Sequence, residues 1–390
     1  MSYERSNRVA QTRNRWIRWS ILGVVLVGMT AITYAHQNVN GFGKPVTVDA
    51  LCPFGGLESL YGFISGAGFI EKTAISSLLL LFGSVGIALV MRRSFCGQIC
   101  PLGALQGIFG ALGGKLFKRR PQVPEAIDRP ARWLKYVILV FFALWTWQAA
   151  ALVIRPYDPW AAWAHISSAE LLAEFGIGVA VLGVSLVGSL VYERFFCKYL
   201  CPMGAFLGIF SKVSMLGIRR DADACISCGV CDKACPMNVP VATADTVTSS
   251  ECISCNECVN SCPVSGALEV SRGSRRLTPA LATGVTVGAL ALVIVVTTAA
   301  GTFDWRMPTL AEAIDQSPTA AADGFDVAAI KGYMSMREIA AATGIPESSF
   351  VERWAVPEGD LGQPMKDIKD TYGFSPDDVR VWVGEQLPAQ

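Results

Sequence analysis

The chain has 390 residues, of which 52% are hydrophobic and only 17% charged, and its formal net charge is +1. This composition excludes an ordinary soluble globule and indicates a membrane protein. The near-zero charge is a sum of opposites, because residues 1–300 carry 26 Lys and Arg against 17 Asp and Glu, whereas residues 301–390 carry 7 against 15.

Five stretches without charged residues are long enough to cross a bilayer, which takes about 20 helical residues. A cleaved signal peptide over residues 1–36 is an alternative for the first stretch, but its 17 residues are long for such a segment. We therefore expect a mainly α membrane protein with five transmembrane helices. In chain order these are Trp19–Ala35, Thr73–Met91, Tyr136–Ile154, Phe175–Tyr192 and Leu277–Phe303.

Basic residues predict how the spans are oriented. Five arginines precede the first span, and under the positive-inside rule they place the N-terminus in the cytoplasm. Alternation from there puts the later basic clusters, with Arg92, Arg93 and Arg194 among them, on the inner side. It also puts acidic residues 301–390 outside, in the periplasm of a Gram-negative bacterium. Because the basic residues follow the membrane topology, they give no support to nucleic-acid binding.

Two blocks of sequence match at an offset of 101 residues and predict an internal pseudo-twofold repeat. One block reads Arg93-Ser-Phe-Cys-Gly-Gln-Ile-Cys-Pro-Leu-Gly-Ala, and the other reads Arg194-Phe-Phe-Cys-Lys-Tyr-Leu-Cys-Pro-Met-Gly-Ala. Each block follows a predicted span and contains a CxxxCP motif. Pro101 and Pro202 suit the first turns of helices that we expect to run to Phe117 and Ile218.

A shorter repeat lies in the acidic C-terminal part. Met336, Ile339 and Gly344 reappear 29 residues later as Met365, Ile368 and Gly373. This pattern predicts paired short helices with glycine at the C-cap, and hence a small helical periplasmic domain. The domains expected are 1–218 in the membrane, 219–272 in the cytoplasm, 273–303 as the fifth span and 304–390 outside.

Eight of the thirteen cysteines form the strongest motif in the chain. They lie in two CxxCxxCxxxCP runs that begin at Cys225 and Cys252. Tandem runs of this spacing are typical of a bacterial-type double [4Fe-4S] ferredoxin, in which the fourth cysteine of each run ligates the other cluster. Zinc is the alternative, but the spacing is not that of a zinc ribbon. We expect two cytoplasmic clusters, one on Cys225, Cys228, Cys231 and Cys262 and the other on Cys252, Cys255, Cys258 and Cys235.

Four more cysteines belong to the CxxxCP motifs. In each motif the two thiols lie four residues apart at a predicted helix N-terminus, where the helix dipole favours a thiolate or another anionic centre. If the repeat brings the motifs together, they enclose a third metal centre near the inner membrane surface, such as another [4Fe-4S] cluster. A dithiol/disulfide pair, a copper site and a structural role are the alternatives. The residues concerned are Cys96, Cys100, Cys197 and Cys201.

The outer side offers few further candidates. Cys52 has no partner cysteine there, and its Cys-Pro-Phe-Gly-Gly turn favours a small buried residue over a ligand. His36 and His165 are the two histidines of the chain. Loop histidines make ordinary polar contacts more often than they hold a haem, so haem is disfavoured. A quinol pocket in which Tyr157, Asp158 or His165 accepts protons is chemically reasonable.

The outer Cys52-Pro-Phe-Gly-Gly-Leu-Glu-Ser-Leu-Tyr segment, the two CxxxCP motifs and the double ferredoxin run together resemble the NapH-type family of membrane ferredoxins. That family is related to the membrane part of NosR and to the CcoG/RdxA proteins. The resemblance covers residues 15–300 and does not extend to residues 304–390. It implies an inner-membrane electron-transfer subunit that links the quinone pool or a cytoplasmic donor to a partner oxidoreductase or cytochrome subunit.

Two hypotheses follow. In the first, the chain is an electron-transfer component of an oxidoreductase complex rather than a stand-alone enzyme, since no P-loop, dinucleotide fingerprint or hydrolase triad is visible in the sequence. In the second, which the relationship to CcoG allows, the chain is an assembly factor that reduces copper or a thiol for the maturation of a respiratory metalloenzyme. The CxxxCP cysteines then handle the metal, and the outer domain is a docking module.

Overall fold

The computed structural model describes residues 2–39, 44–64, 75–117, 123–149, 153–168, 171–272, 275–307 and 330–387, together with Leu310 and Val327. The side chains of residues 2–7, 61–63, 272 and 275 are excepted. The chain folds into two compact units. One comprises Met1–Thr33 and Thr47–Asp304, and the other comprises Tyr34–Val46 and Trp305–Gln390.

Three helices in the described part of the chain are long and apolar enough to cross a membrane, and they lie at three of the predicted spans. They are α1 (Ser2–Asn38), α9 (Leu171–Val191) and α14 (Pro279–Ala299). The two other predicted spans correspond to shorter helices, α3 (Ile75–Met91) and α7 (Leu134–Ala149). Residues 73–74 and 150–152 of those predictions lie outside the described residues, so the total of five spans stays a prediction.

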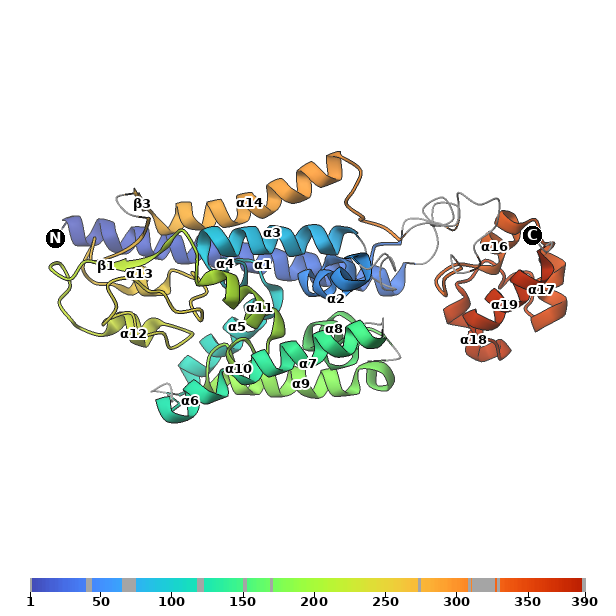
Figure 1. Cartoon of the computed structure of the whole chain (residues 1–390), viewed down its shortest axis with the longest axis horizontal. Helices are drawn as coiled ribbons and strands as arrows, with labels where there is room; N and C mark the ends of the chain where they lie inside the picture. The colour runs from blue at the N-terminus through green and yellow to red at the C-terminus, as the bar shows by residue number, and fades with distance from the viewer. Residues whose placement is uncertain are drawn as a thin grey trace. The chain divides into compact units, whose positions relative to one another are not determined.

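The two repeated blocks, each taken together with the two helices that precede it, fold into elements of the same order. A helix, a long helix, a one-turn helix and a further helix follow one another. Within the first block α3 packs against α2, and within the second block α9 packs against α8, as Figure 1 shows. The blocks also exchange contacts, because α5 of the first packs against α9 and α11 of the second packs against α3. These contacts are reciprocal, while the twofold symmetry of the repeat stays a prediction. The elements are α2 (Pro53–Ile64), α3, α4 (Ser94–Gln98) and α5 (Pro101–Leu116) in the first block, and α8 (Pro159–Ala164), α9, α10 (Phe195–Tyr199) and α11 (Pro202–Ser211) in the second.

Three connecting helices complete the membrane part. They are the 3-10 helices η1 (Asp49–Leu51) and η2 (Arg155–Tyr157) and the helix α6 (Glu125–Ala131).

The helix after the second motif is shorter than predicted. Helix α5 runs to Leu116 as expected, but α11 ends at Ser211, so the predicted end at Ile218 is wrong. Ile218 lies instead in a strand, where it pairs with Val270 and both side chains are buried. A run of apolar residues does not distinguish a helix from a strand that is buried by a distant part of the chain. This strand crosses the predicted domain boundary at residue 218.

A small antiparallel sheet frames the cysteine-rich segment, with strand order β1-β2-β3. The strands are β1 (Gly217–Arg220), β2 (Leu268–Arg272) and β3 (Arg275–Leu277). Between β1 and β2 lie two one-turn helices, α12 (Val230–Ala234) and α13 (Glu257–Ser261), which pack against each other.

The C-terminal unit has a short helix at each copy of the predicted repeat. Helices α16 (Met336–Thr343) and α18 (Met365–Tyr372) each end at a glycine in the left-handed conformation, with φ +74° at Gly344 and +67° at Gly373. Each is followed by a second helix, α17 (Glu347–Trp354) or α19 (Pro376–Gln386). The repeated methionines and isoleucines are buried in one shared core. Residues 34–46 also belong to this unit, although the predicted C-terminal domain comprises only residues 304–390.

Candidate metal centres

The two ferredoxin-type runs have the same unusual backbone conformation. Ser227 and Gly229 of the first run have φ values of 53° and 66°, and Ser254 and Asn256 of the second have 45° and 61°. Left-handed residues other than glycine are uncommon and concentrate at functional sites. Here they curl each CxxCxxC loop so that its three thiols face one cavity.

Two small cavities lie inside these loops, and each is lined by four cysteines. The fourth cysteine of each run lines the cavity of the other run. This is the grouping expected from the spacing, while the ligand roles stay predictions. The Cys225 cavity is lined by Cys225, Cys228, Cys231 and Cys262, and the Cys252 cavity by Cys235, Cys252, Cys255 and Cys258.

The two cavities differ in their access to solvent. Cys228 of the Cys225 cavity is exposed, whereas Cys255 and Cys258 of the other cavity are buried. The backbone N–H of Ser227 lowers the pKa of the Cys225 thiol, whereas burial raises the pKa of the Cys255 thiol to about 12. A thiol with such a high pKa becomes a thiolate at neutral pH when a metal cation takes the place of its proton.

The thiols surround these cavities instead of converging on a point. In the described residues, no three His, Cys, Asp or Glu side chains are grouped closely enough to hold a single metal ion. The remaining lining of the Cys252 cavity is largely apolar, with Ile218, Met237 and Val241 among its residues. Four cysteines around an apolar cavity fit a polynuclear iron–sulfur cluster, which reaches its ligands at several corners. The zinc alternative gains no support.

The four CxxxCP cysteines lie together near the Cys252 cavity. One thiol of each motif is buried within a one-turn helix, and the other stands at the N-cap of the following helix. The amides of Gly103 and Gly204 donate to the N-cap sulfurs, with 3.3 Å between Gly204 N and the sulfur it faces. The four thiols interact electrostatically with one another; they are Cys96, Cys100, Cys197 and Cys201.

The first CxxxCP motif packs directly on the second ferredoxin loop. A side chain at Gly97 would collide with the backbone oxygen of Ile253, so glycine is needed for this approach. The amide nitrogen of the buried Gln98 side chain donates to the Ser254 oxygen at 2.8 Å. The CxxxCP cysteines and the Cys252 cavity are therefore neighbours through these contacts.

Gln106 of α5 joins the two motifs. Its Oε1 accepts the backbone N–H of Phe196 at 3.0 Å, and its Nε2 lies 3.2 Å from the sulfur of Cys197. A residue of the first block thus fixes the one-turn helix that presents a cysteine of the second.

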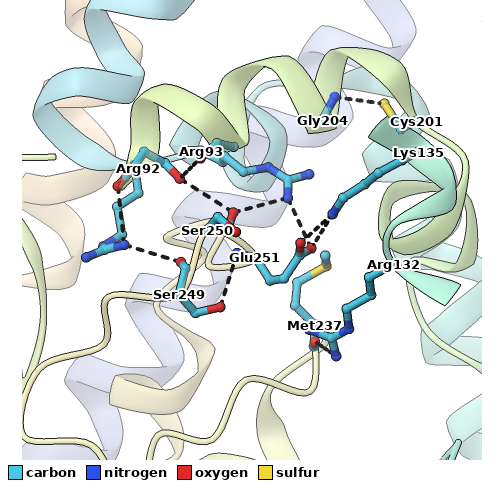
Figure 2. A network of polar contacts seen from close by, with 12 residues as sticks. Arg92, Arg93, Arg132, Lys135, Cys201, Gly204, Met237, Ser249, Ser250 and Glu251 are labelled. Carbon is cyan, nitrogen blue, oxygen red and sulfur yellow. Dashed lines mark hydrogen bonds and ion pairs between the residues drawn. The ribbon is translucent and has the colours of Figure 1, made fainter. Parts of the chain in front are cut away.

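A buried ion-pair network holds the segment that leads into Cys252. Figure 2 shows Glu251 between Lys135, whose Nζ lies 2.5 Å from both carboxylate oxygens, and Arg93, whose Nη1 lies at 3.3 Å. Both basic side chains are almost fully buried. Burial opposes ionisation, but Arg93 and Lys135 hold the pKa of Glu251 below its usual value. Removing one partner would leave a buried charge unpaired, which is costly.

The N-terminal helix contacts the same ferredoxin-type unit. Arg15 and Arg18 of α1 pair with Glu257 at 3.0 and 2.7 Å, and Gln11 Nε2 donates to the Cys262 oxygen at 2.8 Å. Arg18 is buried in these contacts. The N-terminal part of α1 is thereby tied to the helix that carries Cys258.

Several of these polar residues carry no role in the sequence-based prediction. Arg93 and Arg194 are predicted there only as topological charges, yet both are 1% exposed and lie at the cysteines. The available signal was their common place at the start of the repeated block. Lys135 and Glu251 are 116 residues apart and have no signal in the sequence.

The outer candidates have structural partners. Both ring nitrogens of His165 are in contact, one with the Ala161 oxygen at 2.8 Å and the other with Arg155 at 3.1 Å. Asp158 accepts two backbone N–H groups and caps α8. Further contacts are those of Tyr157 with the rings of Phe142 and Trp145, of Cys52 with an apolar cluster, and of His36 Nδ1 with the Pro45 oxygen at 2.7 Å.

Fold and sites together define a membrane protein with cysteine-lined centres of the iron–sulfur type. A family model for a 4Fe-4S binding domain matches twice, at residues 73–120 and 175–220, and one for a 4Fe-4S dicluster domain matches residues 217–263. The first model covers both CxxxCP motifs, and the second covers the ferredoxin runs. No solved structure matches the chain.

Three curated relatives give the comparison. YccM of Escherichia coli (strain K12) is 32% identical over 51% of this chain and 56% of its own length. MJ0750 of Methanocaldococcus jannaschii is 31% identical over 50% of this chain and 77% of its own. The ferredoxin-type protein NapH of Escherichia coli (strain K12) is 26% identical over 57% of this chain and 75% of its own. The chain thus spans just over half the length of YccM. It belongs to the NapH-type family of membrane 4Fe-4S ferredoxins.

Proposed function

We propose that this chain is an iron–sulfur electron-transfer subunit of the bacterial inner membrane. It links the quinone pool or a cytoplasmic donor to a partner oxidoreductase or cytochrome subunit. Its N-terminus and ferredoxin-type unit face the cytoplasm, and residues 304–390 face the periplasm. The basic inner segments and the acidic C-terminal part support this orientation.

The ferredoxin-type cysteines hold two [4Fe-4S] clusters in the crossed arrangement. Clusters bound there supply one-electron transfer. The side chains exclude water from the Cys252 cavity, and the curled loops direct backbone N–H groups toward the sulfurs. The ligands are Cys225, Cys228, Cys231 and Cys262 for one cluster, and Cys252, Cys255, Cys258 and Cys235 for the other.

The CxxxCP cysteines hold a third centre, most simply another [4Fe-4S] cluster. Four thiols from two helix N-termini and two one-turn helices provide the ligands. Nearby positive charge from Arg93 and Arg194 suits an anionic metal–thiolate centre. The donors are Cys96, Cys100, Cys197 and Cys201.

One observation carries the electron-transfer proposal, namely the contact between the first CxxxCP motif and the loop of the Cys252 cavity. Gly97 and Gln98 bring the four CxxxCP thiols against Ile253 and Ser254. Cysteine groups that neighbour one another from a solvent-accessible cavity toward the membrane helices suit electron transfer better than metal delivery. The assembly-factor alternative has no comparable observation in its favour.

Iron analysis and electron transfer in proteoliposomes test the proposal. We expect twelve iron atoms per purified chain, four for each of three [4Fe-4S] clusters, and reduction of an embedded quinone by an external low-potential donor. Eight iron atoms would contradict the third centre. Full iron content without quinone reduction, combined with reduction of added Cu(II), would favour the assembly factor.

A further inference from the structure

Arg93 and Arg194 have buried donor groups without partners. Both side chains are 1% exposed. In the described part of the chain, Nε and Nη2 of each guanidinium find no hydrogen-bond partner. Buried charged donors are costly to leave unsatisfied, and arginine stays protonated even when buried. Such atoms at a metal-type site indicate an anionic ligand that is meant to meet them.

Each arginine acts on the motif of the other block. A Cβ at Gly204 would lie 2.4 Å from Arg93 Nη2, and a Cβ at Gly103 would lie 2.3 Å from Arg194 Nη1. These glycines follow the motif prolines, and their amides face the N-cap sulfurs. Arg194 Nη1 also donates to the Cys96 oxygen at 2.8 Å. The two guanidinium groups therefore lie over opposite motifs.

The charges are close enough to act on the thiols. Arg93 interacts electrostatically with Cys96, Cys201 and Cys197. Arg194 interacts with Cys197 and Cys100. Between them the two arginines reach every thiol of the pair of motifs.

We propose that Arg93 and Arg194 set the charge, and with it the reduction potential, of the centre held by the four CxxxCP cysteines. This inference rests on the third centre of the proposed function. Thiolate-ligated clusters are anionic, and reduction adds one more negative charge. A buried cation nearby stabilises the reduced form, which raises the potential, and the free N–H groups can bond to its sulfurs.

Each arginine also has a carboxylate nearby. Arg93 pairs with Glu251, which is shared with Lys135. Arg194 donates to the Cys96 backbone oxygen and interacts electrostatically with Glu193. The charge of each guanidinium is therefore partly compensated, and we expect replacement of either one to lower the potential.

The test is an EPR-monitored redox titration of the full-length protein in detergent. The signal of the CxxxCP centre is assigned by its loss in Cys197→Ser. At the potential where the wild-type centre is half reduced, Arg194→Gln lowers the ratio of reduced to oxidised centre at least about tenfold, which is 59 mV for one electron. Arg93→Gln lowers it as well, and both variants keep the full iron content.

Two variants separate charge from structure. Arg92→Gln removes a neighbouring buried arginine that bonds to Ser249 and Ser211 oxygens, and it leaves the CxxxCP signal unshifted. Arg194→Lys keeps the positive charge and shifts the potential less than Arg194→Gln. If Arg194→Gln fails to assemble the centre, assembly in Arg194→Lys supports the charge role, and failure of both variants overturns it.

The outcomes also separate this inference from the proposed function. Eight iron atoms in the wild type overturn the third centre and this inference with it. Twelve iron atoms with an unshifted potential in Arg194→Gln overturn this inference alone. A shift of equal size in Arg92→Gln overturns it as well, because burial of any arginine nearby would then explain the effect.

Discussion

Single side chains decide how each group of cysteines is connected to its surroundings. Cys228 is exposed at the Cys225 cavity, while Cys255 and Cys258 are buried at the other cavity. Beyond them, the CxxxCP thiols face Gln106 and two buried arginines. Among the three groups only the Cys225 cavity has an exposed cysteine, which suits electron entry there.

Replacing the fourth cysteine of each run, Cys235 or Cys262, by serine tests whether it ligates the cluster of the other run. Cys235→Ser is expected to alter the same EPR signal as Cys252→Ser, because both residues line one cavity. Cys262→Ser should instead alter the signal that Cys225→Ser alters. EPR of the dithionite-reduced full-length protein measures this, with Cys52→Ser as the control that retains every signal. Pairing of Cys235 with the Cys225 signal would refute the crossed arrangement.

The Lys135–Glu251 pair is a second test on single residues. Lys135→Met removes the cation that contacts both carboxylate oxygens and leaves Glu251 incompletely paired. Breaking a buried pair from one side costs about 3–5 kcal/mol. We expect this loss in the local unfolding free energy of residues 249–262, measured by hydrogen exchange. The exposed Lys212→Met is the control and should change it by less than about 0.5 kcal/mol.

Among the elements, close backbone approaches position the motifs. Helix α5 packs on α9, and a Cβ at Gly113 would overlap the backbone of Leu190. A Cβ at Gly56 of α2 would lie 2.4 Å from the Ser77 oxygen of α3. Gly56 thus brings together two helices of the first block, while Gly113 lets α5 and α9 join the blocks that carry the two CxxxCP motifs.

Gly97→Ala tests the contact between the first motif and the ferredoxin-type loop. The added methyl group would collide with the Ile253 oxygen, so the loop must move away from the motif. We expect a changed EPR line shape for the signal assigned to Cys252 and faster hydrogen exchange of residues 252–256. Gly86→Ala in α3 is the matched control, since no atom lies within 4 Å of the place that its methyl group would take. An unchanged signal in Gly97→Ala would show that this contact is not needed.

The C-terminal unit depends on helix caps. Ser375 and Asp378 form a capping box at α19, and the Ser375 backbone N–H lowers the pKa of Asp378. Ser375→Ala should destabilise α19 by about 1 kcal/mol, seen as faster amide exchange. The exposed Ser348→Ala within α17 should have no such effect.

The capping box also gives a pH dependence with a defined sign. A carboxylate whose folded pKa is depressed adds stability above its unfolded value, about 3.9, and loses it as the pH falls through the folded pKa. Exchange of α19 in the wild type should therefore approach that of Asp378→Asn only in acid. Equal exchange of the two proteins at neutral pH would contradict this role.

On the level of the whole molecule, the chain divides its charge and its chemistry between two units. The cysteines all lie in the unit that contains the membrane helices, and the other unit has a core of its own without a cysteine. The C-terminal unit therefore offers no thiolate ligand to a metal. Such a division suits a cofactor-bearing membrane part with a separate second unit.

Fusions to alkaline phosphatase test the proposed orientation. The enzyme is active only after export, so a fusion after residue 387 should be active and one after Lys212 inactive. Green fluorescent protein at the same sites should give the reverse pattern. Activity at both sites, or only at Lys212, would overturn the assigned orientation.

Much of this protein is readable from local sequence. The apolar stretches predict the three long apolar helices, and the glycine-ended repeat predicts α16 and α18, because hydrophobic length and C-cap conformation are local properties. The run spacing likewise predicts which four cysteines share each cavity. By contrast, the predicted end of α11 at Ile218 is wrong. Ile218 lies in a strand that pairs with Val270, 52 positions further along the chain.

The surroundings of the cysteines depend on tertiary contacts. Lys135 reaches Glu251 across 116 residues, and Arg194 reaches the Cys96 oxygen across 98. From the sequence, a basic residue near a span indicates only the orientation of that span, and only the tertiary structure shows that it is buried beside a thiol. Motif spacing thus determined the class of cofactor, whereas the charge around each centre was decided by segments that meet only in the folded chain.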